Sequence, residues 1–188
     1  MLDFSRRKID VVVMRRLMLL RHAKSDRSTP GARDRDRPLE ERGKAAAPRI
    51  GAYMARHDLV PDRVLCSPAR RTEDTWSLVA TAFAKPPVVE FDDRLYDASA
   101  DTILDVVRKT GADIHSLLVI GHNPGLQDLA GLLIASGDVE ARERIREKFP
   151  TAALLVIDFA FDDWRKLHRR AGRLDRFVTP RSLASATD

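Results

Sequence analysis

Two short apolar runs in the chain end in residues that could together bind and transfer a phosphoryl group. Residues 17–20 are followed directly by Arg21 and His22, and residues 117–120 lead through one glycine to His122. A guanidinium group can donate two parallel hydrogen bonds to phosphate oxygens. An imidazole is largely neutral near pH 7 and can attack phosphorus as a nucleophile. These residue types therefore predict phosphate chemistry where the two runs end.

A third short apolar run, over residues 63–66, is followed a few residues later by a second group of basic residues. Ser67 is typical of a helix N-cap and Pro68 of a first helical turn. We therefore expect a helix over residues 69–84, with Arg70 and Arg71 in its first turn. Cations at a helix N-terminus oppose the macrodipole at a cost of about 0.3–1 kcal/mol. This cost becomes reasonable if an anion binds at this end of the helix.

Strand and helix patterns alternate along the chain. Four consecutive apolar residues are typical of a strand buried on both faces, and apolar residues at spacings of three and four indicate helices. The expected elements also include a strand at 88–91, helices at 39–57, 100–109, 124–135 and 138–148, and strands at 152–159 and 174–178 that pair antiparallel. This order predicts an α/β fold, a three-layer α/β/α domain with a mostly parallel central sheet and an antiparallel edge.

The ends of these strands are where a site is expected. The carboxyl ends of parallel strands meet at one edge of such a sheet, and ligands commonly bind there. The basic residues that end the three runs should therefore lie together. The alternative is that each strand ends in solvated basic residues and that each histidine is structural, as lone histidines usually are. The repetition of the pattern at three strand ends favours a common site.

The length of the chain limits it to one well-buried core. It has 188 residues, of which 44% are hydrophobic and 32% charged, and it shows no internal repeat. We expect a single domain over residues 15–181, a carboxyl-terminal tail over 182–188 and a poorly ordered or non-native extension over 1–14. The apolar part of that extension is too short and interrupted for a signal peptide, and Met14 is an alternative translation start.

Cysteine content and charge restrict the compartment and the partners. The single cysteine, Cys66, excludes an intrachain disulfide and a multi-cysteine zinc site and agrees with a cytoplasmic protein. No apolar run approaches the roughly 20 residues needed to span a bilayer. The formal charge of +5 permits an acidic or phosphorylated partner. We expect no nucleic-acid binding, because the sequence offers neither a recognition helix nor exposed stacking aromatics.

Basic residues are also dense between residues 165 and 176. A solvated surface is the simpler interpretation, because apolar residues alternate with the charges. The alternative is that an acidic phosphotransfer domain docks there and contacts Arg169 and Arg170.

Three separate motifs resemble those of the histidine phosphatase superfamily, the phosphoglycerate mutase-like enzymes. Residues 20–24 resemble its Arg-His motif, residues 67–75 its second arginine motif and residues 121–125 its second-histidine motif. The patterns at residues 37–43 and 149–153 add to the similarity, which runs from about residue 16 to residue 181. The order of the motifs and the length of the chain resemble the small branch of SixA-type phosphohistidine phosphatases.

The resemblance implies a role for each matching residue. His22 would be the nucleophile that becomes transiently phosphorylated, while Arg21 binds phosphate oxygens. Arg71 matches the arginine of the second motif, whereas the adjacent Arg70 falls where another residue usually stands. His122 would donate hydrogen bonds to the phosphoryl oxygens. Neither a metal nor a cofactor is implied.

The proton donor is the point at which the sequence departs from the superfamily. Many members use a glutamate after the second arginine motif, and the acid-phosphatase branch has an aspartate directly after the second histidine, where this chain has Asn123. The available acids are Asp92, Asp93 and Asp97, in a stretch that also fits a solvated turn and a helix cap. A weak donor matters less for phosphohistidine, because imidazole leaves more easily than an alkoxide.

The resemblance as a whole implies a monomeric phosphatase that works through a phosphohistidine intermediate. Its substrate would be phosphohistidine on a histidine-phosphotransfer protein. One alternative is a small-molecule phosphomonoesterase that uses the same pocket, although little of the chain remains for a cap domain to enclose a small substrate. The other alternative, from a different class, is a non-catalytic module that binds phosphoproteins.

Overall fold

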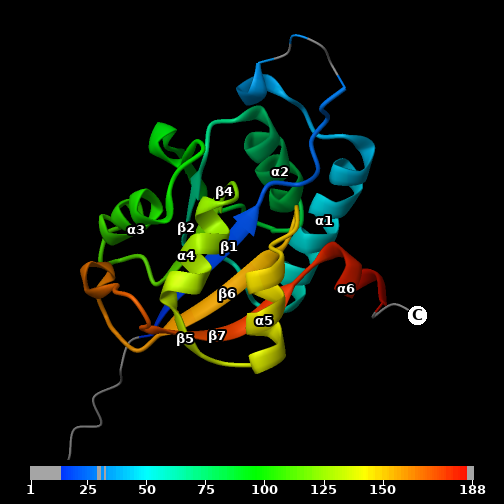
Figure 1. Cartoon of the computed structure of the whole chain (residues 1–188). Coiled ribbons are helices and arrows are strands. Elements are labelled where there is room, and N and C mark those ends of the chain that lie inside the picture. The colour runs from blue at the N-terminus through cyan, green and yellow to red at the C-terminus, as the bar shows by residue number, and fades with distance from the viewer. Residues whose placement is uncertain (1–13, 29–30, 32, 186–188) are drawn as a thin grey trace, which may run out of the picture.

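A mixed seven-stranded sheet forms the centre of the molecule (Figure 1). The computed structural model describes residues 14–28, 31 and 33–185. The strands are β1 Arg15–Arg21, β2 Arg63–Cys66, β3 Val88–Phe91, β4 Ser116–Gly121, β5 Ile134–Ser136, β6 Leu154–Phe159 and β7 Gly172–Val178. They lie in the order β3-β2-β4-β1-β6-β7-β5.

The pairing of these strands confirms a mostly parallel sheet. The pairs β2 with β3, β2 with β4, β1 with β4 and β5 with β7 are parallel, and β6 pairs antiparallel with both β1 and β7. The antiparallel strand therefore lies inside the sheet and not at its edge, where we expected it; the edge on that side is β5, which pairs parallel with β7. The first two residues of β5, Ile134 and Ala135, fall within the stretch where we expected a helix over 124–135.

Helices cover both faces of the sheet, so the three-layer architecture is confirmed (Figure 1). One face carries α1 Glu41–Arg56, α2 Arg70–Ala80 and α6 Pro180–Ser185; the other carries α3 Ala100–Arg108, α4 Gly125–Leu133 and α5 Val139–Glu147. Three short 3-10 helices, η1 Asp34–Asp36, η2 Asp93–Leu95 and η3 Trp164–Lys166, lie in connecting loops. Each helix expected from apolar spacing is present in a slightly shorter form.

The central strands explain why their sequences are continuously apolar. Leu17 and Leu19 of β1 pack into the core beneath α3, α4 and α5, while Met18 and Leu20 pack into the core beneath α1 and α2. All four side chains are fully buried. Successive side chains of a strand point to opposite faces, so a strand with a core on each face needs an apolar residue at every position. The polar residues of β1, Arg15, Arg16 and Arg21, lie at the two ends of the strand.

The start of α1 is fixed against the chain that follows β1. The backbone carbonyl of Lys24 accepts a hydrogen bond from the amide of Glu40 at 3.0 Å. A Cβ added at Gly43 would lie 2.1 Å from the same carbonyl oxygen, so a side chain at this position would push α1 away. Ser25 and Leu39 form an isolated antiparallel bridge, which closes the base of the loop between them.

The structure describes the two ends of the chain only in part. Residues 1–13 of the expected extension and residues 186–188 lie outside the described part of the chain, whereas residues 182–185 belong to α6. Within the described residues, no helix has the length and apolar character needed to cross a membrane.

Candidate active site

The carboxyl ends of β1, β2 and β4 bring the candidate residues together. Arg21 ends β1 and lies opposite Gly121 of β4, so that His22 and His122 follow neighbouring strands. The ring centroids of the two histidines lie 5.2 Å apart. Arg71, in the first turn of α2, has its Nη2 atom 3.2 Å from His122 Nδ1. The strand-end pattern therefore located one cluster, as expected.

The imidazole of His22 is buried and oriented by the backbone. Only 8% of the residue is exposed. Its Nδ1 atom lies 2.7 Å from the carbonyl oxygen of Ala23. Because a carbonyl only accepts hydrogen bonds, Nδ1 carries the proton, and Nε2 keeps a free lone pair. A backbone carbonyl thus holds one nitrogen of the ring and leaves the other available for attack.

The two arginines of the cluster are held by contacts to backbone oxygens. Arg21 Nη1 donates to the carbonyl of Phe149 at 2.8 Å, and Arg71 Nη1 donates to the carbonyl of Asp34 at 2.6 Å. The Nε atoms of both guanidinium groups are buried and have no partner among the described residues. Buried donors are normally paired, so these two fit the binding of an additional acceptor such as a phosphate oxygen.

Ser67 has a different role from the one that its sequence context predicts. The expectation that it caps α2 is wrong: the helix begins at Arg70, its N-cap is Ala69, and no side chain caps it. Ser67 Oγ instead lies 2.7 Å from His122 Nε2. Since Arg71 can only donate to Nδ1, the neutral ring of His122 carries its proton on Nε2 and donates it to Ser67.

Burial and positive neighbours keep both histidines neutral. Burial is the main cause that lowers the pKa of His22 to about 3, with His122, Arg71 and Arg21 adding to the effect. The pKa of His122 falls to about 4, again chiefly through burial and then through the charge of Arg71. A bound phosphoryl group would add negative charge and favour protonation of His122, which would let Nδ1 donate to a phosphoryl oxygen.

These depressed pKa values predict a pH-dependent stability. In the unfolded chain the histidines have a pKa of about 6.5, so below that pH the unfolded state binds protons that the folded state refuses. The free energy of unfolding should therefore fall as the pH is lowered from about 7 to about 5. Urea unfolding at several pH values measures this, and His22→Gln should make the decline shallower. An equal slope in the wild type and His22→Gln would contradict the assignment.

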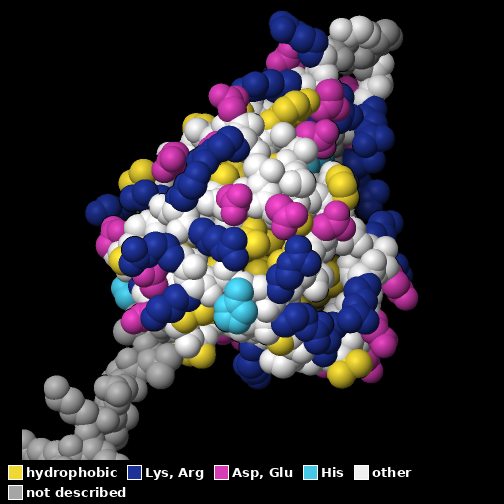
Figure 2. Space-filling view, turned by 60° about the vertical axis from the view of Figure 1, so that its left-hand side comes forward, with side chains coloured by type: hydrophobic (Ala, Val, Ile, Leu, Met, Phe, Trp, Pro, Cys, Tyr) yellow, Lys and Arg dark blue, Asp and Glu magenta, His cyan; other side chains and the backbone are white. Residues whose placement is uncertain are grey.

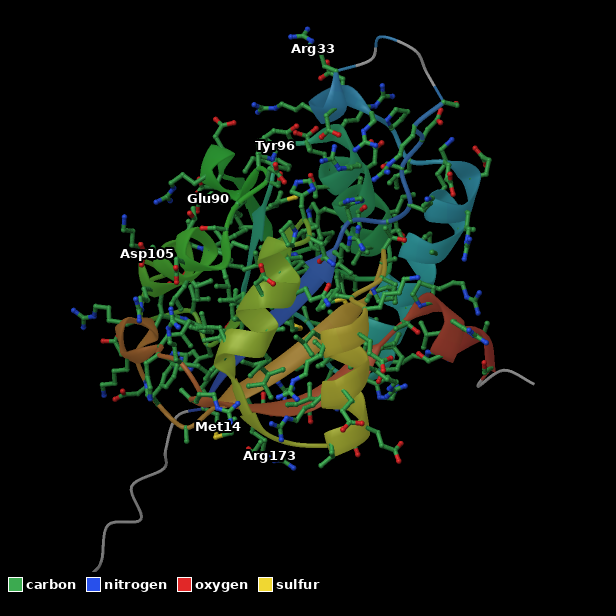
Figure 3. All side chains as sticks on the ribbon, viewed as in Figure 1. Met14, Arg33, Glu90, Tyr96, Asp105 and Arg173 are labelled. Atoms are coloured by element: carbon green, nitrogen blue, oxygen red, sulfur yellow. The ribbon has the colours of Figure 1, made fainter. Side chains whose placement is uncertain are left out.

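Two residues that the sequence did not single out complete the cluster. Asp34 Oδ2 accepts hydrogen bonds from Arg71 Nη2 and from the hydroxyl of Tyr96, both at 2.9 Å. The ring of Tyr96 lies edge-on to His122, with centroids 5.7 Å apart. Figure 3 shows Tyr96 beyond the arrowhead of β1, at the end of the sheet that holds the cluster, and Met14 and Arg173 at the opposite end.

Asp34 is an anion rather than a proton donor. Burial opposes its ionisation, but the hydrogen bond from Tyr96 and the charges of Arg71 and Arg37 together lower the pKa of its carboxyl below the usual value. The ionised carboxylate occupies one edge of the Arg71 guanidinium, so a phosphate that binds Arg71 there must compete with Asp34.

The acids proposed as proton donors lie in structural roles around η2. Asp92 is the N-cap of η2, and a hydrogen bond from Arg94 is the main cause that lowers the pKa of its carboxyl. Asp93 pairs with Arg35 at 2.7 Å. Asp97 is exposed in a left-handed backbone conformation, with φ at 49°. Among the described residues, no contact joins any of the three acids to the histidine cluster, which favours the turn-and-cap interpretation for this stretch.

Arg70 and Asn123 also lie at the margin of the cluster. Arg70 is exposed, and its Nε atom lies 3.8 Å from Asp74, one helical turn along α2. The amide of Asn123 donates to the carbonyl of Phe149 at 3.0 Å. Asn123 therefore fixes the same carbonyl that orients Arg21, which is a positioning role.

In the described part of the chain, no three His, Cys, Asp or Glu residues are grouped so that they could hold a metal ion.

Comparison with models of protein families shows which family this chain belongs to. The model of branch 1 of the histidine phosphatase superfamily matches residues 17–116. The chain belongs to the histidine phosphatase superfamily. The matched span contains Arg21, His22 and Arg71, and His122 lies six residues beyond its end.

Relatives of similar length share most of the chain. The uncharacterized protein Rv1276c of Mycobacterium tuberculosis is 35% identical over 164 residues, which cover 86% of this chain and 100% of the relative. The uncharacterized chloroplastic protein At3g52155 of Arabidopsis thaliana is 29% identical over 185 residues, which cover 90% of this chain and 80% of the relative.

Solved structures with the same fold include proteins described as SixA. The candidate phosphohistidine phosphatase SixA from Agrobacterium tumefaciens is 30% identical and superimposes with a TM-score of 0.76, covering 88% of this chain and 98% of that one. The corresponding candidate from Nakamurella multipartitia is 28% identical with a TM-score of 0.77, covering 89% of this chain and 96% of that one. This member of the superfamily is therefore SixA-like in structure.

Proposed function

We propose that the protein is a phosphatase that works through a phosphohistidine intermediate on His22. The observation that carries the proposal is the pairing of two buried imidazoles, His22 and His122, 5.2 Å apart beside the guanidinium of Arg71. A pocket that only binds phosphate does not need a buried neutral imidazole whose second nitrogen is fixed by a carbonyl. A nucleophilic nitrogen does need this orientation.

The reaction has two halves. In the first, His22 Nε2 attacks phosphorus, the N–P bond forms, and the bond from phosphorus to the leaving group breaks; the leaving group takes a proton from water. In the second, a water molecule attacks phosphorus, the N–P bond breaks, phosphate leaves, and the proton of the water passes to solvent. The hydrogen bond from Nδ1 to Ala23 stabilises the positive charge that the ring gains while it is phosphorylated.

The remaining residues of the cluster act on the phosphoryl oxygens. Phosphoryl transfer spreads negative charge over three equatorial oxygens, and donors fixed in advance stabilise this charge at no cost of reorganisation. Arg21 and Arg71 supply such donors, since each is already held by a backbone carbonyl. His122 supplies a third when the phosphoryl charge protonates it.

The surroundings of the cluster support phosphohistidine on a histidine-phosphotransfer protein as the substrate. The carboxylate that contacts Arg71 is that of Asp34, whose lowered pKa makes it a poor proton donor. An alkoxide leaving group depends on a donor, whereas the imidazole of phosphohistidine leaves with less help. SixA is the name given to phosphohistidine phosphatases of similar fold, which agrees with this choice.

Substrate preference tests this proposal. We expect kcat/KM for a phosphorylated histidine-phosphotransfer domain to exceed that for an alkyl phosphate by at least about 10²-fold, the usual contribution of a general acid that the alkyl phosphate would need. Phosphate release from both substrates at matched concentrations measures the ratio. Equal or reversed preference would support a small-molecule phosphomonoesterase instead. Binding of both without release would support a non-catalytic phosphoprotein-binding module.

A further inference from the structure

A basic groove lies beside the histidine cluster. Its volume is about 610 Å³, and it is bordered by α1, by the segment that joins α5 to β6, and by α6. Five cationic side chains line it, from four separate parts of the chain: Lys24, Arg42, Arg49, Lys148 and Arg181. We refer to these residues and the space between them as the basic groove.

The basic groove and the histidine cluster share a wall. Ala152 lines the groove, and its amide lies 3.1 Å from the carbonyl oxygens of both Arg21 and His22. Lys24, which also lines the groove, follows His22 by two residues. The basic groove therefore adjoins the segment that carries His22.

The charges of the groove are not balanced by the protein. Its lining contains no Asp or Glu. Within the described residues, none of its five cationic side chains takes part in an ion pair or a side-chain hydrogen bond. Cations gathered without counter-charges repel one another and attract anions from solution. The groove is thus complementary to a partner that carries several negative charges.

The basic region between residues 165 and 176 differs from the groove, because acidic side chains lie close to its cations. On the face shown in Figure 2, which carries α3 and the turn after β6, Lys and Arg side chains are interspersed with Asp and Glu. Arg165 pairs with Asp163 at 2.5 Å, and Arg169 lies 3.7 Å from Asp101. The cations there are largely neutralised by their neighbours, which leaves less attraction for an acidic partner.

The chemistry of the lining favours acidic side chains of a protein as the ligand. Arg42 and Arg49 lie two helical turns apart on one face of α1, with the small Ala45 and Ala46 between them. The five cations come from four separate parts of the chain and surround about 610 Å³, which is more space than a single phosphate fills. The lining contains no aromatic residue on which nucleic-acid bases could stack.

We propose that the basic groove is the docking surface for an acidic segment, rich in Asp and Glu, on the protein that carries the phosphohistidine. The proposal rests on the proposed function, because it assigns the groove to the substrate of the neighbouring histidine cluster. Docking there raises the local concentration of the phosphoryl group at His22 without any contact to the reacting atoms. It also gives the protein a means of selecting a protein substrate that does not depend on the histidine cluster itself.

The test compares two pairs of neutralised arginines. The probe is an unphosphorylated histidine-phosphotransfer domain with an acidic surface, and the measurement is its Kd by fluorescence anisotropy at low and at physiological salt. For Arg42→Gln/Arg49→Gln, the Kd should rise about tenfold and its salt dependence should weaken, as the loss of two exposed ion pairs requires. The control, Arg169→Gln/Arg170→Gln, removes the same charge from the other basic region and should leave the Kd unchanged.

The same variants separate docking from catalysis. Hydrolysis of a small aryl phosphate, which cannot reach the groove and the cluster together, should proceed at the wild-type rate in both double variants and thereby show that they are folded. An unchanged Kd in Arg42→Gln/Arg49→Gln, or a larger loss in the control pair, would overturn the groove as the docking surface. Failure of the wild type to release phosphate would instead overturn the proposed function, while the Kd values would still decide on docking.

Discussion

Replacing His22 with alanine is expected to lower kcat for an aryl phosphate by about 10⁴–10⁶-fold, the range found when a catalytic nucleophile or its activating partner is removed. The reason is that the N–P bond of the intermediate can form only on this ring, whose Nδ1 is fixed by Ala23 at 2.7 Å. Phosphate binding should be largely retained, because Arg21 and Arg71 remain. Steady-state phosphate release and equilibrium binding of tungstate measure the two effects separately.

A histidine far from the cluster provides the control for this experiment. His168 is exposed, and its Nδ1 atom lies 2.8 Å from the carbonyl oxygen of Lys166. His168→Ala removes the same chemical group, and we expect its turnover to match that of the wild type. Wild-type turnover in His22→Ala would show that the reaction does not pass through this residue.

Replacing Arg71 with alanine is expected to cause the second largest loss of catalytic rate. Removal of a guanidinium that stabilises a phosphoryl-transfer transition state costs about 10³–10⁵-fold in rate, and we expect a loss in this range for Arg71→Ala. Arg71 is 4% exposed and contacts His122. Its neighbour Arg70 is exposed and lies 3.8 Å from Asp74. Arg70→Ala is therefore the matched control, with an expected change of about twofold or less.

A loss of activity in Arg71→Ala has two explanations: the guanidinium binds the phosphoryl group, or it supports the loop that carries Asp34. The variant Asp34→Asn distinguishes them. Both substitutions break the ion pair between the two residues, which lie 2.9 Å apart, but only Arg71→Ala removes the guanidinium. If the guanidinium binds the phosphoryl group, Asp34→Asn should keep most of the activity. Equal losses of activity in Arg71→Ala and Asp34→Asn would mean that Arg71 supports the loop that carries Asp34. Equal activities of Arg70→Ala and Arg71→Ala would show that Arg71 has no part in the mechanism.

The fold and the centre of the site were predictable because their signals are local. Continuous apolar runs identified β1, β2 and β4. The residue types that follow each run named Arg21, His22, His122 and the pair Arg70 and Arg71, of which the family resemblance selected Arg71. These signals need no knowledge of distant contacts, since a strand buried on both faces is apolar at each position until it leaves the core. The parallel pairing of the strands then brings their ends together.

The features that the sequence did not reveal depend on contacts between distant segments. Ser67 has the local signature of an N-cap, but its contact with His122, 55 residues away, determines its role. Asp34 is one of many charged residues in its loop, and only its contact with Arg71 distinguishes it. The edge strand β5 continues the apolar pattern of α4, so the change from helix to strand depends on pairing with β7.

Helical geometry in the second arginine motif could have distinguished Arg71 from Arg70. Arg70 and Arg71 are adjacent, and successive residues of a helix point about 100° apart, so only one of them can face the end of the sheet. Buried Thr72 and Thr75 follow on the inner side of α2, and Thr75 accepts a hydrogen bond from the amide of Ala23 at 2.9 Å. Helical spacing from these positions favours Arg71 as the inward residue.

Trapping the intermediate tests the central claim most directly. The wild-type protein is mixed with a phosphohistidine-bearing phosphotransfer domain, quenched within milliseconds under alkaline conditions that preserve phosphohistidine, and digested for peptide mapping by mass spectrometry. We predict one phosphoryl group on the peptide that contains His22, formed and lost at rates compatible with turnover, and none in His22→Ala. Full turnover with no phosphorylated peptide, or with the phosphoryl group on another residue, would contradict the account.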